Sequence, residues 1–151
     1  MKLRRATSVD LTAVVALQQL AYARNRVLLG VEPLPLLADY AEIFRTMEIW
    51  LAGARGGLGD TIEGVLILEP HADHMLIWSV STAPEAQSKG LGRELLAAAE
   101  TRARELRLTK MRLYTGAILE HLVDWYGRHG YTVERIEQMP DRQVAHMVKS
   151  L

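Results

Sequence analysis

The sequence predicts a mixed α/β (α+β) fold, in which a β-sheet is flanked by helices. Two apolar patterns alternate along the chain: short runs in which every second residue is apolar, and longer runs with apolar residues at three- and four-residue steps. Their order is β-α-α-β-β-β-α-β-α-β-β, which is typical of a sheet covered by helices. The 151 residues, 49% hydrophobic and 24% charged, suit a single domain over residues 1–151.

Each element has its own signal in the sequence. Strands are expected at residues 3–6, 47–52, 62–68, 75–82, 110–115, 131–136 and 144–148, and helices at about 11–24, 36–45, 93–108 and 119–129. Ser8 or Asp10 is a suitable N-cap for the first helix. Residues 24–37 are expected to be irregular because they hold Gly30, Pro33 and Pro35. The four glycines at 53, 56, 57 and 59 predict a turn.

Composition excludes several classes of protein. Eighteen basic and eighteen acidic side chains give a formal net charge of zero, which argues against a dedicated nucleic-acid or membrane-surface protein. The absence of cysteine excludes a disulfide scaffold, a thiolate zinc site and a cysteine nucleophile. No apolar run approaches the ~20 residues of a membrane span, and the first residues carry no signal core. We therefore expect a cytoplasmic protein with no nucleic-acid or membrane partner.

One segment, residues 77–93, carries the chemistry. It is a strand that stops at Ala83-Pro84, then a polar loop, then a helix that follows Gly90-Leu91-Gly92. Glycines let a ligand approach the backbone, the first turn of a helix presents unpaired N–H groups, and the helix dipole adds positive charge. Lys89 and Arg93 add full charges. This arrangement predicts a pyrophosphate site, and its spacing fits neither a P-loop nor a dinucleotide-binding fingerprint.

These residues resemble the GNAT superfamily of N-acetyltransferases. Gln87, Gly90 and Gly92 fill the fixed positions of that family's Gln/Arg-x-x-Gly-x-Gly/Ala motif, which binds the pyrophosphate of acetyl-CoA. Four further segments resemble its third strand, fifth strand, tyrosine helix and last strand: residues 62–66, 113–115, 125–131 and 144–149. The resemblance implies a central, mostly antiparallel mixed sheet of six or seven strands with about four helices.

The resemblance also implies roles for particular residues. Val80, Ser81 and Thr82 would lie along the pantetheine arm, with the Val80 backbone N–H as oxyanion donor. The coenzyme loop would comprise Gln87, Ser88, Lys89, Gly90, Leu91, Gly92 and Arg93. Tyr126 would be the general acid that protonates the departing thiolate. The acceptor amine would attack directly, giving an acetylated amine and free coenzyme.

Two positions depart from the family pattern. Trp78 stands where many relatives carry a glutamate base, and Leu122 stands where many carry an asparagine that bonds the coenzyme. A tryptophan takes no proton, so the identity of the base is open. These departures suggest an alternative: a non-catalytic acyl-CoA-binding or regulatory module on the same fold.

The acceptor side is expected from residues 24–37 and the end of the chain. Arg24 and Arg26 could hold a carboxylate or phosphate of a small-molecule or peptide amine, or simply end a helix. Leu28, Leu29 and Val31 suggest an apolar wall, and Trp78 is a further candidate substrate residue. The five histidines show no metal-binding spacing, so no metal is expected. A homodimer is possible on this fold.

Overall fold

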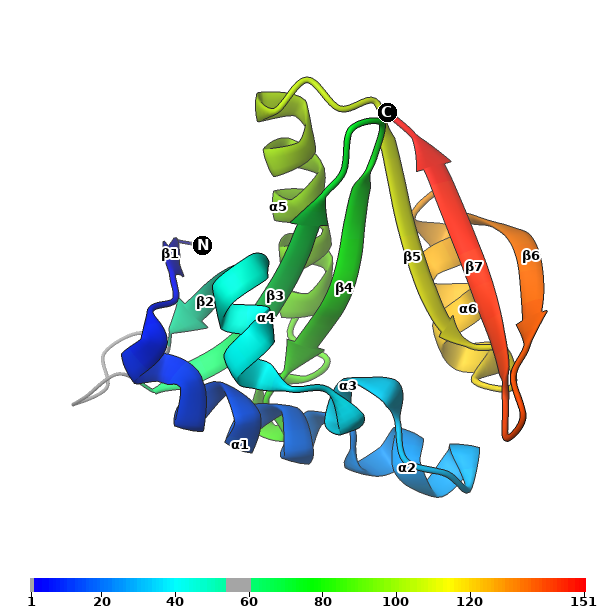
Figure 1. Cartoon of the computed structure of the whole chain (residues 1–151), viewed down its shortest axis with the longest axis horizontal. Helices are drawn as coiled ribbons and strands as arrows, with labels where there is room; N and C mark the ends of the chain where they lie inside the picture. Colours follow the sequence, from blue (N-terminus) through cyan, green and yellow to red (C-terminus); the bar gives the residue numbers. More distant parts are fainter. Residues whose placement is uncertain (1, 54–60) are drawn as a thin grey trace.

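The computed structural model describes residues 2–53 and 61–151, and within them a seven-stranded sheet is flanked by helices (Figure 1). The strands are β1 (Leu3–Arg5), β2 (Glu48–Gly53), β3 (Ile62–Pro70), β4 (Met75–Thr82), β5 (Lys110–Gly116), β6 (Thr132–Gln138) and β7 (Gln143–Ser150). Their order across the sheet is β1-β2-β3-β4-β5-β7-β6. All neighbours are antiparallel except β4 and β5, so the expected mostly antiparallel mixed sheet is confirmed.

The helices cover both faces of this sheet. They are α1 (Leu11–Ala21), α2 (Ala23–Leu29), α3 (Leu34–Leu37), α4 (Tyr40–Thr46), α5 (Leu91–Glu105) and α6 (Glu120–Arg128), with short 3-10 turns η1 (Ser8–Asp10) and η2 (Pro84–Ala86). Figure 1 shows α1 and α4 in front of the sheet and α5 behind it. No helix in residues 2–53 and 61–151 is long and apolar enough to cross a membrane.

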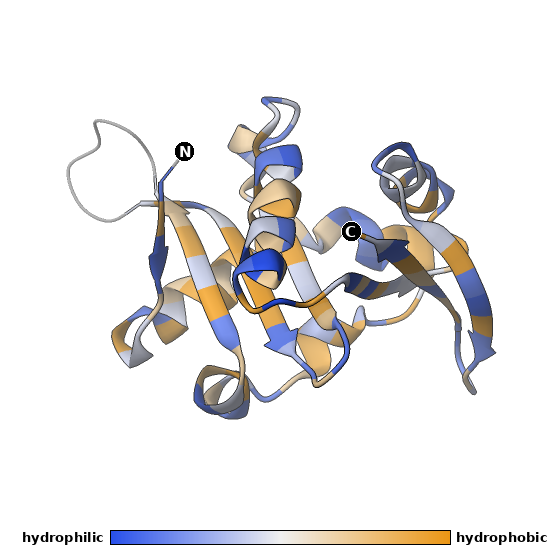
Figure 2. Cartoon of the chain, turned by 90° about the horizontal axis from the view of Figure 1, so that it is seen from above, coloured by the Kyte–Doolittle hydropathy of each residue, from blue (hydrophilic) through white to orange (hydrophobic). Residues whose placement is uncertain are grey.

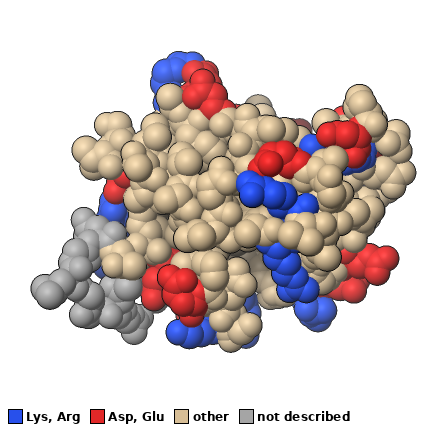
Figure 3. All heavy atoms as spheres, turned by 90° about the horizontal axis from the view of Figure 1, so that it is seen from below, with Lys and Arg blue, Asp and Glu red and all other residues tan. Residues whose placement is uncertain are grey.

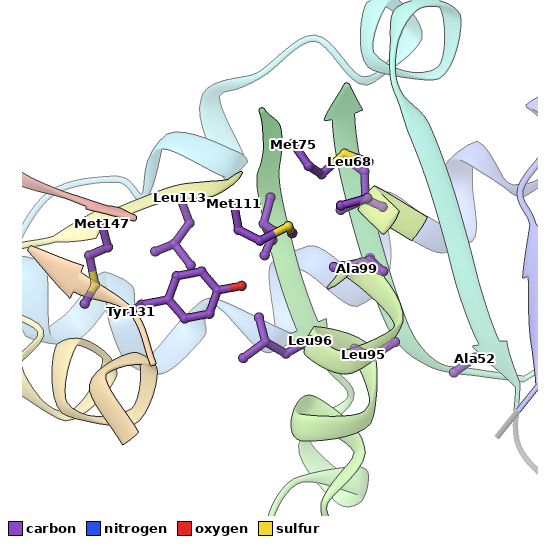
Figure 4. Packing of buried hydrophobic residues seen from close by; sticks show 13 residues of the cluster. Ala52, Leu68, Met75, Leu95, Leu96, Ala99, Met111, Leu113, Tyr131 and Met147 are labelled. Atoms are coloured by element: carbon purple, nitrogen blue, oxygen red, sulfur yellow. The ribbon is translucent and has the colours of Figure 1, made fainter. Parts of the chain in front are cut away.

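Each face of the sheet has its own hydrophobic cluster. One cluster packs Leu95, Leu96 and Ala99 of α5 against the sheet, and it also contains Met111 and Leu113 of β5 (Figure 4). The other packs Val14, Leu17 and Ile43 of α1 and α4 against β2 and β3. The strands in the middle of the sheet are accordingly mostly hydrophobic, whereas the edge strand β1 is hydrophilic (Figure 2). The coverage of both faces fixes the position of α1 and α5 relative to β4.

The N-terminal helices differ from the sequence prediction. The expected helix 11–24 is interrupted at Tyr22, and the stretch expected to be irregular holds α2 and α3. The described residues therefore hold six α-helices rather than about four. Gly30 adopts a φ of 71° and ends α2, so the glycine acts as a helix C-cap. Of the predicted glycine turn, residues 54–60 lie outside the described residues.

A buried polar cluster ties α5 to the C-terminal strands. Glu100, 8% exposed, accepts hydrogen bonds from Lys149 Nζ at 2.9 Å and from the Tyr131 hydroxyl at 3.1 Å. Lys149 also donates to the carbonyl oxygen of His129 at 2.9 Å. A carboxylate removed from water in this way needs both donors.

We expect Lys149→Met to destabilise the protein by about 3 kcal/mol, because it leaves Glu100 as an uncompensated buried charge. The double variant Lys149→Met/Glu100→Gln should regain most of that loss, since no buried charge remains. Urea unfolding followed by circular dichroism measures both. A double variant no more stable than Lys149→Met would show that the loss comes from packing and not from the buried charge.

Candidate active site

β4 and β5 separate part of the way along their length, and this opens the candidate site. The two strands pair only from Met75 with Met111 to Ile77 with Leu113. The pairing ends where β4 carries a β-bulge: Leu68 pairs with Ile77 but Ile67 pairs with Ser79, so Trp78 is an extra residue. A bulge bends a strand and increases its twist. The bulge therefore accounts for the divergence seen between β4 and β5 in Figure 1.

The bulge also changes which side chains face α1. Ile77 packs in the cluster on the α5 side, and Val80 packs against the same cluster. Ser79 and Ser81 instead reach Gln18 of α1 on the other face. Without the extra residue, Ser79 would share a face with Ile77, because side chains alternate along a strand.

Backbone groups of β4 point into the gap. Ala83 N–H donates to the Glu63 carbonyl oxygen on the β3 side at 2.7 Å. In an antiparallel ladder, alternate residues turn their N–H and C=O to the same neighbour. Ser81 therefore also bonds toward β3, and the polar backbone groups of Val80 and Thr82 face the gap, where β5 no longer pairs.

The gap holds a cavity of about 560 Å³ that reaches from α2 to the start of α5. Its lining comes from α1 and α2, from β4 and β5, from the loop before α5, from α6 and from the β6–β7 turn. Such a volume is typical of a small-molecule or cofactor site.

The loop before α5 presents backbone N–H groups at one end of this cavity. Ser88 and Gly90 have φ angles of 66° and 81°, and Gly90 is the N-cap of α5. The first α-helical bond of this turn runs from Glu94 N–H to the Gly90 carbonyl oxygen. The N–H groups of Leu91, Gly92 and Arg93 precede that bond and remain available to an anion.

Gly92 leaves space that a side chain would fill. A Cβ at this position would lie 3.5 Å from the Trp125 ring, which is ordinary van der Waals contact. The packing of the protein therefore does not require a glycine here. The open backbone lies beside the cavity, which both Gly92 and Trp125 line, so it suits the close approach of a ligand.

Tyr126 of α6 brings a phenol into the cavity. Its ring packs on Trp125 and Tyr131, at centroid distances of 5.0 and 6.0 Å. Burial raises the pKa of Tyr126 above its ordinary value, and charge on nearby Tyr22 would raise that pKa further. Its hydroxyl makes no hydrogen bond within the part of the chain that the structure describes. The phenol is thus held as a protonated donor whose partner would be a ligand.

Buried hydrogen bonds fix the opposite wall. Gln18 is fully buried in α1 and donates from Nε2 to the Tyr40 hydroxyl and the Ser79 Oγ, both at 3.0 Å. The Ser81 hydroxyl donates to Gln18 Oε1, and the Tyr22 hydroxyl lies 2.8 Å from Ser79 Oγ. Burial raises the pKa of Tyr22 to about 12, so this phenol is protonated at physiological pH.

Trp78, which stands where many members of the resembled family carry a glutamate, lies at the cavity. Its ring lines the cavity and packs edge-on against Tyr40, with centroids 6.1 Å apart. Among the described residues that line the cavity there is no aspartate or glutamate, whereas four arginines line it: Arg24, Arg93, Arg128 and Arg142. Burial raises the pKa of Tyr114 above its ordinary value, and the charges of Glu69 and Glu137 raise that pKa further. The cavity therefore has no carboxylate base among its described lining residues and is rich in positive charge, and it holds one histidine, His121.

Most residues predicted from sequence come together at the cavity. Those that line it are Arg24, Leu29, Trp78, Val80, Ser81, Thr82, Gln87, Ser88, Gly90, Gly92, Arg93, Leu122 and Tyr126. Lys89 and Arg26 are not among the lining residues, and Arg26 forms an ion pair with Glu32 at 2.8 Å. The Leu91 side chain packs into the core, so only its backbone is available to a ligand.

Sequence reasoning missed several residues of the site. Tyr22, Asn25, Tyr114, Arg128 and Arg142 line the cavity, although the sequence did not single them out as site residues. Tyr131, in contrast, is buried in the core and 2% exposed. A tyrosine at the end of a predicted helix was the only signal for Tyr22. Within residues 2–53 and 61–151, no three metal-ligating side chains are grouped as a metal site.

Comparisons with known proteins agree with this geometry. The chain is similar to a coenzyme A complex of an N-acetyltransferase from Thermoplasma acidophilum (TM-score 0.79, 16% identity, 99% of this chain and 98% of that one). It is also similar to the ribosomal-protein-S18-alanine N-acetyltransferase of Escherichia coli (TM-score 0.78, 16% identity, 99% of this chain and 92% of that one). It is similar to nourseothricin acetyltransferase as well, with a TM-score of 0.61 and 19% identity. That match covers 70% of this chain and 65% of the other, so the chain spans about two thirds of that protein.

At these identities the structural likenesses show the fold. A comparison with curated protein sequences gives no match. Family comparison matches residues 15–131 to the family described as "Acetyltransferase (GNAT) family". This match includes α5, its preceding loop and Tyr126, and it covers more than half of the chain. The chain therefore belongs to the GNAT family of acetyltransferases.

Proposed function

We propose that this acetyltransferase uses acetyl-CoA to acetylate a primary amine of a small molecule or peptide by direct attack. The observation that carries the proposal is a single cavity lined by three kinds of group. These are the backbone of β4 at its divergence from β5, the N–H groups at the start of α5, and the Tyr126 hydroxyl, which has no partner among the described residues.

The coenzyme end is assigned to the loop and α5. The N–H groups from Gly90 to Arg93 bind the pyrophosphate, and the Arg93 guanidinium adds charge. Val80 and Thr82 offer backbone groups to the pantetheine arm along β4. Ser81, in contrast, turns its side chain to Gln18, so its part in binding is to hold β4 in place.

In the chemical step the protein supplies an oxyanion donor and a general acid. The Val80 N–H stabilises the oxyanion as the amine nitrogen attacks the thioester carbon. As the C–N bond forms and the C–S bond breaks, Tyr126 gives its proton to the leaving sulfur, and the proton lost by the amine passes to water. Tyr126 then regains a proton from solvent. Its raised pKa keeps it protonated at the start of each turnover.

The lack of an acid in the cavity predicts a steep pH dependence. An alkylamine of pKa about 10.4 is only about 0.04% neutral at pH 7. We expect its kcat/KM to rise roughly tenfold per pH unit between pH 7 and 9. Tyr126 does not limit this rise, because its pKa is raised. An arylamine or hydrazine, already neutral at pH 7, should show almost no rise. A plateau for the alkylamine from pH 6.5 upward, with chemistry limiting the rate, would contradict a base-poor site.

Trp78 and Leu122 favour a second candidate, an acyl-CoA-binding module without catalysis. Both side chains line the cavity at positions where the family carries polar groups. A screen of amines for acetyl-CoA-dependent thiol release separates the two candidates. Turnover with any amine supports the enzyme, whereas acetyl-CoA binding without thiol release across the panel would support the module.

A further inference from the structure

The hydrogen bonds around Gln18 form a chain that ends at the cavity, and they fix which atom donates in each bond of that chain. The Tyr40 hydroxyl donates to the Pro35 carbonyl oxygen at 2.8 Å, so its oxygen must accept from Gln18. Gln18 Nε2 therefore faces Tyr40 and Ser79, and Oε1 faces the Ser81 hydroxyl. Only this orientation of the Gln18 amide gives hydrogen-bond partners to the Tyr40, Ser79 and Ser81 hydroxyls and to the Pro35 carbonyl.

The same reasoning fixes which atom donates in the hydrogen bond between Ser79 and Tyr22. Its Oγ already accepts from Gln18, and within residues 2–53 and 61–151 its hydroxyl has one possible acceptor, the Tyr22 oxygen at 2.8 Å. If Tyr22 donated instead, the buried Ser79 hydrogen would have no partner, which is costly. Ser79 therefore donates to Tyr22, and the Tyr22 hydrogen is free to point into the cavity that Tyr22 lines.

A positive charge in the same cavity favours an anion. Arg24 lies two residues beyond Tyr22 in α2, lines the cavity and has no ion-pair partner in the described part of the chain. The other arginine outside α5 and α6, Arg142, is paired with Asp141 at 3.0 Å. Figure 3 shows the face with α1 and α2 as mostly uncharged, with basic and acidic groups in small clusters. The unpaired Arg24 guanidinium, which lines the same cavity as Tyr22, is therefore a local feature and not part of a broad basic surface.

We propose that the acceptor is a primary amine carrying an anionic group a few bonds from its nitrogen, bound by the Tyr22 hydroxyl and the Arg24 guanidinium. This inference rests on the proposed function and names the substrate class of the same site. A cationic amine without that group would meet arginine and no carboxylate. The local positive charge also lowers the pKa of the bound amine and favours the neutral, nucleophilic form.

The test compares amines that differ only in the anionic group. Leucine, leucinamide and 3-methylbutylamine share a skeleton, and phosphoethanolamine with ethanolamine forms a second pair that distinguishes phosphate from carboxylate. The assay measures thiol release at saturating acetyl-CoA with wild type, Tyr22→Phe, Arg24→Gln and Arg26→Gln. Arg26→Gln is the matched control, because Arg26 lies in the same helix but pairs with Glu32 and is not a lining residue.

We expect Tyr22→Phe and Arg24→Gln each to raise the KM for the preferred anionic amine about tenfold or more, with kcat changed less than KM. The ratio of kcat/KM between the acid and its neutral analogue should fall about tenfold in both variants and stay unchanged in Arg26→Gln. The KM for acetyl-CoA should not move. An unchanged acid-to-neutral ratio in Arg24→Gln and Tyr22→Phe would overturn the inference and leave the proposed function standing.

A binding readout keeps the inference testable if no amine is turned over. Trp78 and Trp125 line the cavity, so quenching of tryptophan fluorescence reports ligands there. Tighter binding of leucine than leucinamide, lost in Arg24→Gln, would support the anion site even if the proposed function failed. The inference would be overturned if wild type bound leucine and leucinamide equally well. It would also be overturned if Arg24→Gln bound leucine and phosphoethanolamine as tightly as wild type does.

Discussion

Tyr126→Phe should slow acetyl transfer by about 10²- to 10⁴-fold, the range in which a positioned general acid contributes. The phenyl ring keeps its contacts with Trp125 and Tyr131, so the fold should be unchanged. Only the hydroxyl is removed, and that hydroxyl has no protein partner to lose within residues 2–53 and 61–151. Single-turnover rates at saturating acetyl-CoA measure the effect on the chemical step.

The same variant provides its own control. The Kd for acetyl-CoA and the urea midpoint should match wild type, because neither depends on the missing hydroxyl. A single-turnover rate within about twofold of wild type would remove Tyr126 from the mechanism. A weakened Kd with an unchanged rate would instead assign the phenol to coenzyme binding.

Gly92→Val should weaken acetyl-CoA binding about 100-fold or more. A branched side chain at this position covers the N–H groups of the first turn of α5. Loss of two hydrogen bonds to a charged group, at about 1.5 kcal/mol each, corresponds to roughly that factor. Because a Cβ at Gly92 would lie 3.5 Å from Trp125, the fold itself accepts the first atom of the new side chain. Titration calorimetry with acetyl-CoA measures the change.

Gly127→Val is the matched control for this experiment. Gly127 lies in α6, outside the cavity lining, and nothing lies within 4 Å of a Cβ built there. The control should bind acetyl-CoA as wild type does. If Gly92→Val also binds normally while remaining folded, the assignment of the loop before α5 to the pyrophosphate is wrong.

The sequence predicts the sheet well because its signals are local. The strand at residues 75–82 matches β4 in both bounds, since alternation begins at Met75 and Ala83-Pro84 ends it. The helix after Gly90 is recognised from apolar steps at Leu95, Leu96 and Ala99, although it begins two residues earlier than predicted, at Leu91. The candidate coenzyme loop follows from the same local pattern.

The acceptor side could not be predicted, because it depends on contacts between distant residues. Gln18 is a polar residue in an apolar helix, and only its bonds to β4, 61 and 63 residues away, explain its full burial. Leu20, an apolar residue of the same helix, is in contrast 61% exposed. The bulge at Trp78 depends on the register of β4 with β3, which no local pattern encodes.

The most direct test of the central claim is mass spectrometry of protein and products after incubation with acetyl-CoA and an acceptor amine. We predict one N-acetylated amine for each free coenzyme A thiol. With acetyl-CoA alone, the mass of the protein should stay unchanged, because the amine attacks the thioester directly. Acetyl-CoA that binds in the cavity without releasing thiol to any amine would contradict an N-acetyltransferase. An acetylated protein that passes its acetyl group to the amine would contradict direct attack.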